Sequence, residues 1–356
     1  MASASAHPER FRAALVAALL ATAAIVPLVA TATIGGEEPP AVGELARELA
    51  RAAAREDWER AVEAARQLAA ARPASAPDAY NLACMLARSG RPEEAVAAFA
   101  RSAELGFAFP STVLRDADLD AIRERDGFAA ALERIRRNNQ AALEQAKPRL
   151  ENAPLLSFAP RRQRKDASPA APLPLIVALH GYGGTPEALA EVYRPTASRL
   201  GALLVVPRGQ EAVGRGFGWG VVEQAEHLVL AAIERTAAEQ PVGSIVLSGF
   251  SQGAGVALTL AARHPERFAG VVAVAGYFEE RLALLPAQAP PAFPRFVFLN
   301  GELDEAVGNN RRAVERLERS GVAVRSRFYP GVGHAFPPPD ERDRELAMAL
   351  RFALGS

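Results

Sequence analysis

The sequence is poor in the residues that build disulfides and metal sites. Its 356 residues include one cysteine, Cys84, and five histidines. One cysteine excludes both an intrachain disulfide and a zinc site made of cysteines, so Cys84 is expected to be a small, buried apolar residue. The chain has no H-E-x-x-H pattern, no P-loop and no dinucleotide-binding glycine fingerprint after a strand. We therefore expect neither a metal nor another cofactor.

The sequence also lacks an excess of either charge. It carries 41 basic and 41 acidic residues, and its formal net charge is zero. Without a field of a single sign, nucleic acid and anionic membrane surfaces are excluded as main partners. The hydrophobic content of 49% is typical of a globular protein, and the length suffices for two ordinary domains.

An uncharged run near the N-terminus predicts export. The run from Ala13 to Gly36 follows Arg10 and Arg12, and it contains Ala-Thr-Ala at 30–32, which is typical of a cleavage site. The run also approaches the ~20 residues that span a bilayer. Residues 1–40 are therefore interpreted as a signal peptide, with an uncleaved N-terminal membrane anchor as the alternative. Either interpretation predicts a periplasmic, secreted or membrane-anchored protein.

A repeat follows over residues 41–150. Three similar segments place Ala61, Ala95 and Ala129 34 residues apart, and the middle segment is the clearest. This is the period of tetratricopeptide repeats, which the segment resembles, with a degenerate third unit. The resemblance implies an all-α helical domain. Its concave surface would bind a protein partner, or the domain would pack on the rest of the chain without one.

Residues 151–172 are predicted to connect this repeat to a second domain. The apolar stretch 155–158 is a candidate edge strand. The basic and proline-rich stretch 161–172 is interpreted as a solvated linker or hairpin tip, with an anion site as the less favoured alternative.

Residues 173–356 alternate strand-like and helix-like segments. Continuous apolar runs are typical of strands that are buried on both faces, so the alternation predicts a mostly parallel sheet flanked by helices. The expected strands are 175–179, 202–206, 245–248, 270–275, 295–299 and 324–329, and the expected helices are 186–200, 221–240, 252–263, 309–320 and 339–354.

The stretch Gly249-Phe250-Ser251-Gln252-Gly253 has the pattern of a nucleophile elbow. It stands between an apolar run and a segment rich in helix formers, which is the context that a G-x-S-x-G elbow requires. In so tight a turn Ser251 takes a strained conformation, and a Cβ atom at residue 249 or 253 would collide with its neighbours. The Gln252 amide would then face a developing oxyanion from a helix N-terminus.

The base that activates Ser251 can be found by elimination. In a fold with this elbow the chain order is serine, acid, histidine, and only His264 and His334 follow Ser251. His264 lies at the end of the helix that starts at the elbow, too far away along that helix to reach the serine. His334 follows the last strand in a glycine-rich loop and is therefore the predicted general base. The loop before it offers three acids, which are Glu302, Asp304 and Glu305.

Four motifs together resemble a known family. The motifs HGYGG, GFSQG, GELD and YPGVGH occur in this order. They are similar to those of the carboxylesterase, phospholipase and acyl-protein thioesterase family and of related dienelactone-hydrolase-like esterases. The resemblance covers residues 173–356. Asn300 and Ala254 depart from it, where such proteins often carry histidine and a third glycine, and this leaves the subfamily open.

The resemblance assigns the remaining residues. It implies an α/β-hydrolase fold, Asp304 as the acid of a Ser251–His334–Asp304 triad, and an oxyanion hole formed by the amides of Tyr182 and Gln252, with Gly183 as runner-up for Tyr182. His180 would brace the oxyanion loop by hydrogen bonding. Trp219 is interpreted either as a pocket-lining residue or as ordinary core.

The implied function is serine esterase activity on a small-molecule or lipid ester through an acyl-enzyme. A thioesterase or lysophospholipase with the same triad is an alternative. A second alternative is a repeat-based interaction protein whose hydrolase part is an inactive scaffold.

Overall fold

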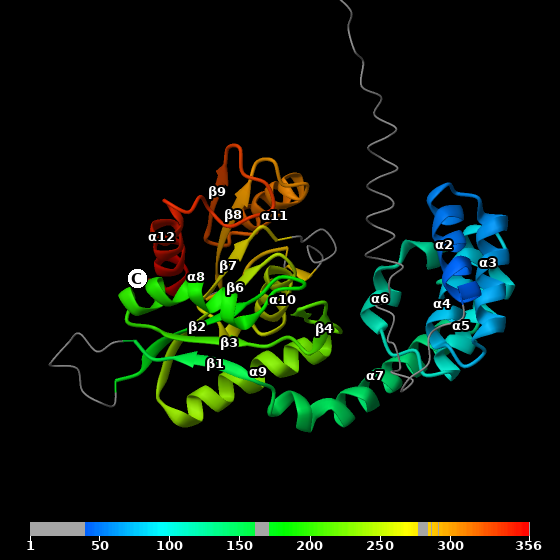
Figure 1. The fold of residues 1–356 in the computed structure, drawn as a ribbon, viewed down its shortest axis with the longest axis horizontal. Coiled ribbons are helices and arrows are strands. Elements are labelled where there is room, and N and C mark those ends of the chain that lie inside the picture. Colours follow the sequence, from blue (N-terminus) through cyan, green and yellow to red (C-terminus); the bar gives the residue numbers. More distant parts are fainter. Residues whose placement is uncertain (1–39, 161–170, 277–283, 286, 291, 356) are drawn as a thin grey trace, which may run out of the picture. The chain divides into compact units, whose positions relative to one another are not determined.

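The computed structural model describes residues 40–160, 171–276, 284–285, 287–290 and 292–355. The chain divides into two compact units, Met1–Gln145 and Ala146–Ser356 (Figure 1). The predicted signal peptide or anchor and most of the basic stretch at 161–172 lie outside the described residues. Among the helices of the described ranges, none is both long and apolar enough to span a membrane.

The first unit is helical and begins with two helical hairpins. The first four helices of its described part are α2 (Pro40–Ala54), α3 (Trp58–Ala71), α4 (Ala76–Arg88) and α5 (Pro92–Glu104). The side chain of Asp57 caps α3 and that of Ser75 caps α4, each by accepting a hydrogen bond from an amide of the first turn. In the second hairpin, Leu86 and Phe99 are buried between α4 and α5.

The third predicted repeat is not a second copy of this hairpin. The short helices α6 (Pro110–Arg115) and η1 (Ala117–Ile122) precede the long helix α7 (Phe128–Glu151). Ala61 and Ala95 are fully buried, whereas Ala129, which belongs to the unit that the sequence marks as degenerate, is exposed. The reason is that α7 begins only at Phe128 and buries its next turn, around Leu132 and Ile135, instead.

Polar side chains form a closed cluster inside the helical unit. The Tyr80 hydroxyl donates to Asp116 Oδ2 at 2.6 Å, and Cys84 Sγ lies 3.5 Å from the same oxygen. Asp116 Oδ1 accepts from the Asp118 amide at 3.0 Å and so caps η1. Burial raises the pKa of both Tyr80 and Cys84, which keeps both groups protonated as donors. Cys84 is buried, as the sequence predicts.

The second unit contains a seven-stranded sheet. Its strands follow the order β1-β3-β2-β6-β7-β8-β9, and only the edge strand β1 runs antiparallel to its neighbour. The bounds are β1 (Leu155–Phe158), β2 (Leu173–Leu179), β3 (Leu203–Pro207), β6 (Val242–Phe250), β7 (Gly270–Val274), β8 (Arg295–Gly301) and β9 (Val324–Tyr329). The predicted mostly parallel sheet is confirmed, and the stretch 155–158 is its edge strand.

Helices cover both faces of this sheet (Figure 1). They are α8 (Pro186–Arg199), α9 (Val222–Glu239), α10 (Gln252–Arg263), α11 (Val307–Arg319) and α12 (Arg342–Leu354), with a short η2 (Pro265–Arg267). One core joins the side chains of Ile176, Leu204 and Val272 to Tyr193 of α8 and Leu346 of α12. The central strands are buried on both sides, which explains their continuous apolar sequences.

A small hairpin was missed by the sequence prediction. Strands β4 (Glu211–Val213) and β5 (Gly216–Gly218) pair antiparallel in a sheet of their own. Each strand has only three residues, and β5 contains two glycines, which have little strand propensity. No pattern in the sequence therefore predicts the hairpin. The hairpin lies beside the loop that follows β2, because the amide of Phe217 donates to the Gly184 carbonyl at 2.9 Å.

Candidate active site

Ser251 occupies a sharp turn between β6 and α10. Its backbone has φ 53° and ψ −116°, a left-handed conformation that is uncommon for a residue with a side chain. A Cβ atom on Gly249 would lie 2.3 Å from the Gly253 carbonyl carbon, and one on Gly253 would lie 2.2 Å from the Leu179 carbonyl oxygen. Both glycines are therefore required by steric exclusion, as predicted. The Ser251 amide donates to the Val274 carbonyl at 2.9 Å, which ties the turn to β7.

The structure brings Ser251, His334 and Asp304 together in one hydrogen-bonded chain. His334 Nε2 lies 2.9 Å from Ser251 Oγ, and His334 Nδ1 lies 3.0 Å from Asp304 Oδ2. A carboxylate only accepts, so the ring proton is on Nδ1, and Nε2 is free to accept the serine proton. Asp304 is buried, whereas the side chain of His334 is half exposed.

The loops that carry Asp304 and His334 are bonded to one another. The amide of Leu303 donates to the Val332 carbonyl at 2.9 Å, and that of Glu302 donates to the Tyr329 carbonyl at 3.0 Å. A Cβ atom on Gly301 would lie 2.1 Å from the Val332 oxygen, so a larger residue would force the two loops apart. Asp304 is oriented further because its Oδ1 accepts from the Ala306 amide at 2.9 Å.

The backbone amides near Ser251 include two that have no hydrogen-bond acceptor within the described ranges. They belong to Tyr182, in the loop after β2, and Gln252, at the N-terminus of α10. A Cβ atom on Gly181 would lie 3.3 Å from the Ser251 Cβ, so this loop runs directly past the serine. The amide of Gly183, the runner-up, donates to the Phe217 carbonyl at 2.9 Å and is not available to a substrate.

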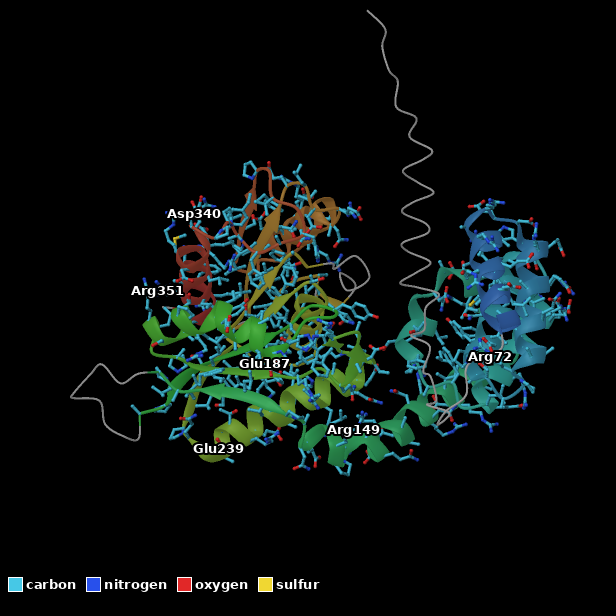
Figure 2. All side chains as sticks on the ribbon, in the orientation of Figure 1. Arg72, Arg149, Glu187, Glu239, Asp340 and Arg351 are labelled. Atoms are coloured by element: carbon cyan, nitrogen blue, oxygen red, sulfur yellow. The ribbon has the colours of Figure 1, made fainter. Side chains whose placement is uncertain are left out.

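His180 joins the loop after β2 to the β4–β5 hairpin. Its Nε2 accepts from the Gly209 amide at 3.0 Å, so the ring proton is on Nδ1, which donates to the Gly181 carbonyl at 2.9 Å. Burial lowers the pKa of His180, an effect partly offset by the Gly181 hydrogen bond and by Glu187 in the first turn of α8 (Figure 2). The imidazole is therefore held neutral, in the tautomer that both hydrogen bonds need.

Trp219 is a buried core residue, as one of the two interpretations expects, and it also forms hydrogen bonds. Its Nε1 donates to the His180 carbonyl at 2.7 Å, and its ring stacks on the His180 ring at 4.8 Å. Its backbone amide donates to Oε1 of Gln252 at 3.2 Å. One residue thus contacts both segments that carry the free amides. No local pattern signals these contacts, because the partners lie more than 30 residues away along the chain.

The other candidate residues lie apart from the serine. His264 ends α10, and its Nε2 contacts Glu226 at 2.7 Å. Glu302 is exposed and lies 3.5 Å from Arg311. The two departures from the family pattern are both buried: Asn300 donates to the Gly301 carbonyl at 3.0 Å, and Ala254 packs inside α10.

An open hollow lies beside His334. Its volume is about 660 Å³, and it is lined by Phe250, the 331–339 loop and Arg342. Phe250 stacks on Phe336 with ring centroids 4.8 Å apart and lies 5.3 Å from the His334 ring. The lining next to the imidazole is therefore aromatic, and it suits an apolar part of a substrate.

The fold and this arrangement of side chains are of the α/β-hydrolase type. Residues 192–352 match the dienelactone hydrolase family. The chain is also 32% identical over 151 residues to the proposed esterase NocK of Nocardia uniformis subsp. tsuyamanensis, a match that covers 38% of this chain and 42% of that protein. The chain thus spans less than half the length of this relative.

The matches among solved structures include two esterases and one uncharacterized protein. Esterase PE8 is 26% identical with a TM-score of 0.45, over 57% of this chain and 98% of that one. A carboxylesterase from Mesorhizobium loti is 22% identical with a TM-score of 0.42, over 50% of this chain and 88% of that one. An uncharacterized protein from Bacillus cereus covers 87% of this chain and 97% of its own, with 16% identity and a TM-score of 0.46.

Proposed function

We propose that this protein is a serine esterase that cleaves carboxylic esters through an acyl-enzyme. One observation carries the proposal: a buried carboxylate, an imidazole and a serine hydroxyl are hydrogen-bonded in series, next to two amides without acceptors. Asp304 holds the Nδ1–H tautomer of His334 and stabilises its imidazolium. His334 is the general base, and Ser251 is the nucleophile.

The reaction proceeds in two acyl transfers. Ser251 Oγ attacks the ester carbonyl carbon while His334 Nε2 takes the hydroxyl proton, and the carbonyl oxygen becomes an oxyanion. The amides of Tyr182 and Gln252 donate to that oxyanion. The tetrahedral intermediate collapses, the imidazolium protonates the departing alcohol, and an acyl-serine remains. A water deprotonated by His334 then releases the carboxylic acid and regenerates Ser251.

Thioesters and lysophospholipids are alternative substrates of the same residues. The chemistry at the carbonyl is the same for all of these substrates, so the residues that line the site determine which substrate is preferred. The hollow beside His334 is open and aromatic, which favours short or accessible acyl esters over chains that need a closed tunnel.

The helical unit is proposed to be tetratricopeptide-like and to bind a protein partner. Two helical hairpins with buried Ala61 and Ala95 at the 34-residue spacing support this proposal. Export to the periplasm or beyond, through a signal peptide or with an N-terminal anchor, remains our proposal for the location. An interaction protein with an inactive hydrolase scaffold is disfavoured, since such a scaffold needs neither the bonded histidine nor free amides.

Labelling of the full-length protein with a fluorophosphonate tests the esterase proposal. The probe phosphonylates only an activated serine, so we expect labelling of the wild type and none of Ser251→Ala. Hydrolysis of p-nitrophenyl acetate should fall by at least about 10³-fold in the same variant. His264→Ala is the matched control and should keep both activities. A wild type that takes no label, or a labelled Ser251→Ala, would contradict the proposal.

A further inference from the structure

One face of the β4–β5 hairpin lies against the oxyanion loop. In the antiparallel register Glu211 is opposite Gly218, and Val213 is opposite Gly216. A Cβ atom on Gly216 would lie 2.0 Å from the Gly183 carbonyl oxygen, so the loop crosses the hairpin at this glycine. The side chains of Glu211 and Val213 belong to the same hairpin face, because alternate residues of a strand point the same way.

Two side chains converge at Gly218 on this face. A Cβ atom on Gly218 would lie 3.1 Å from Glu211 Oε2 and 3.2 Å from Tyr182 Cδ2. Because both atoms are measured from the same Cβ position, the distance between them is at most the sum of the two distances, 6.3 Å. Tyr182 is 63% exposed, so its ring remains accessible beside the carboxylate.

The Glu211 carboxylate has no counter-ion in the described part of the chain. The amide of Gly220 donates to it, and burial raises its pKa. No lysine, arginine or histidine there forms an ion pair with it, and Arg208 stacks on Phe217 at 4.8 Å. Phe217 points to the opposite hairpin face by strand alternation. A half-buried carboxylate beside an accessible aromatic ring is thus available to a positive charge from outside.

This pair lies next to the reacting groups. Tyr182 carries one of the two free amides, and its neighbour Gly181 approaches Ser251 closely. Consecutive Cα atoms are about 3.8 Å apart, so the backbone of Tyr182 lies close to a carbonyl bound at the serine. The pair is therefore within reach of a short substrate.

We propose that Tyr182 and Glu211 form a subsite for a cationic group, a quaternary or primary ammonium, carried by the ester substrate. The ring face attracts the cation, and the carboxylate neutralises it. The subsite would select amino-alcohol esters over neutral esters of the same shape. This inference rests on the proposed esterase function for the identity of the substrate, but not for the binding of the cation.

A pair of isosteric esters tests the proposal on the full-length protein. Acetylcholine and 3,3-dimethylbutyl acetate differ only in that a trimethylammonium group replaces a tert-butyl group. We expect kcat/KM to favour the cationic ester by about five-fold or more, and Glu211→Gln to lower that ratio by about three- to five-fold. Tyr182→Leu should lower it similarly, whereas Tyr182→Phe, which keeps the ring, should retain it.

Controls and a binding measurement separate the two proposals. Glu302→Gln removes an exposed carboxylate from another loop and should leave the ratio unchanged. Calorimetric binding of benzyltrimethylammonium needs no catalysis, and Glu211→Gln should weaken it about three-fold or more. Ester hydrolysis with a ratio near one, or binding insensitive to Glu211→Gln, overturns the subsite and leaves the esterase. Binding without hydrolysis supports the subsite and overturns the esterase.

Discussion

Two buried polar clusters, one in each unit, differ in where their hydrogen bonds end. In the helical unit, Tyr80 and Cys84 contact one oxygen of Asp116, and the other oxygen caps η1, so each bond stays inside the core. In the sheet unit, the bonds from Trp219 end at His180 and Gln252, next to amides without acceptors. The first cluster stabilises packing. The second contacts the segments that carry the Tyr182 and Gln252 amides, which we propose to stabilise the charge of a reaction intermediate.

The largest effect is expected in the sheet unit, from replacing Asp304 rather than a neighbouring acidic residue of the same loop. Asp304→Asn should lower kcat by roughly 10⁴-fold, because an amide in that position no longer fixes the Nδ1–H tautomer of His334. Steady-state turnover of p-nitrophenyl acetate measures this. Glu305→Gln, an exposed change in the same loop, should stay within about two-fold of wild type. A loss below ten-fold in Asp304→Asn would show that another group supplies the negative charge.

A smaller effect on kcat is expected from removing a hydrogen bond of Trp219, which contacts both segments that carry the free amides. Trp219→Phe keeps a buried ring but removes the donor to the His180 carbonyl, so the oxyanion loop is held less firmly. We expect kcat to fall by roughly 10- to 100-fold with little change in KM, since the lost stabilisation concerns the transition state.

Tyr193→Phe provides the matched control for Trp219→Phe. It also removes one buried hydrogen bond, at 2.7 Å to Ser248, from a fully buried ring. It should change the melting temperature as much as Trp219→Phe does and leave kcat near the wild-type value. Equal losses of kcat in both variants would mean that Trp219 acts through stability alone.

The smallest effect is expected in the helical unit and concerns stability alone. Burial, followed by the nearby charge of Asp116, raises the pKa of Asp118 to about 6. The folded state therefore binds this proton more tightly than the unfolded state, and its contribution to stability is lost as the pH rises from about 4 through 6.

Asp118→Asn removes that titration. The variant should be more stable than the wild type at pH 7, by on the order of 1 kcal/mol, and the difference should vanish below about pH 4. Urea unfolding at several pH values measures it, with Asp120→Asn as the exposed control in the same segment. Lower esterase activity in Asp118→Asn would contradict the prediction that the helical cluster affects stability alone. A stability difference that does not depend on pH would contradict the assignment to the titration of Asp118.

Much of the sheet unit follows from local sequence. The apolar runs predict six strands of the main sheet, and 155–158 supplies the antiparallel edge. The bounds of α10 and β9 agree with the predicted ones, while α12 begins three residues later than expected, at Arg342. Gly249 and Gly253 predict the elbow, because there is no space for a Cβ atom at either position.

Other features could not be predicted because they depend on partners distant in sequence. The β4–β5 hairpin has weak strand propensity and is held by Gly183 and Gly184. Ala129 is exposed because α7 starts at Phe128. The 34-residue spacing does not predict where that helix starts. Trp219 was left between two interpretations, because its hydrogen bonds are made to residues far along the chain.

The sequence by itself determined the order of elements and the chain order of serine, acid and histidine, since strand burial, tight turns and glycine requirements are local. Only the tertiary structure decided which amides near Ser251 remain free. Gly183 and Tyr182 are adjacent in sequence, yet Phe217 takes the first amide and no described group takes the second. The physical reason is that each donor bonds to whichever acceptor the packed elements bring within reach, and that acceptor is set by the whole fold.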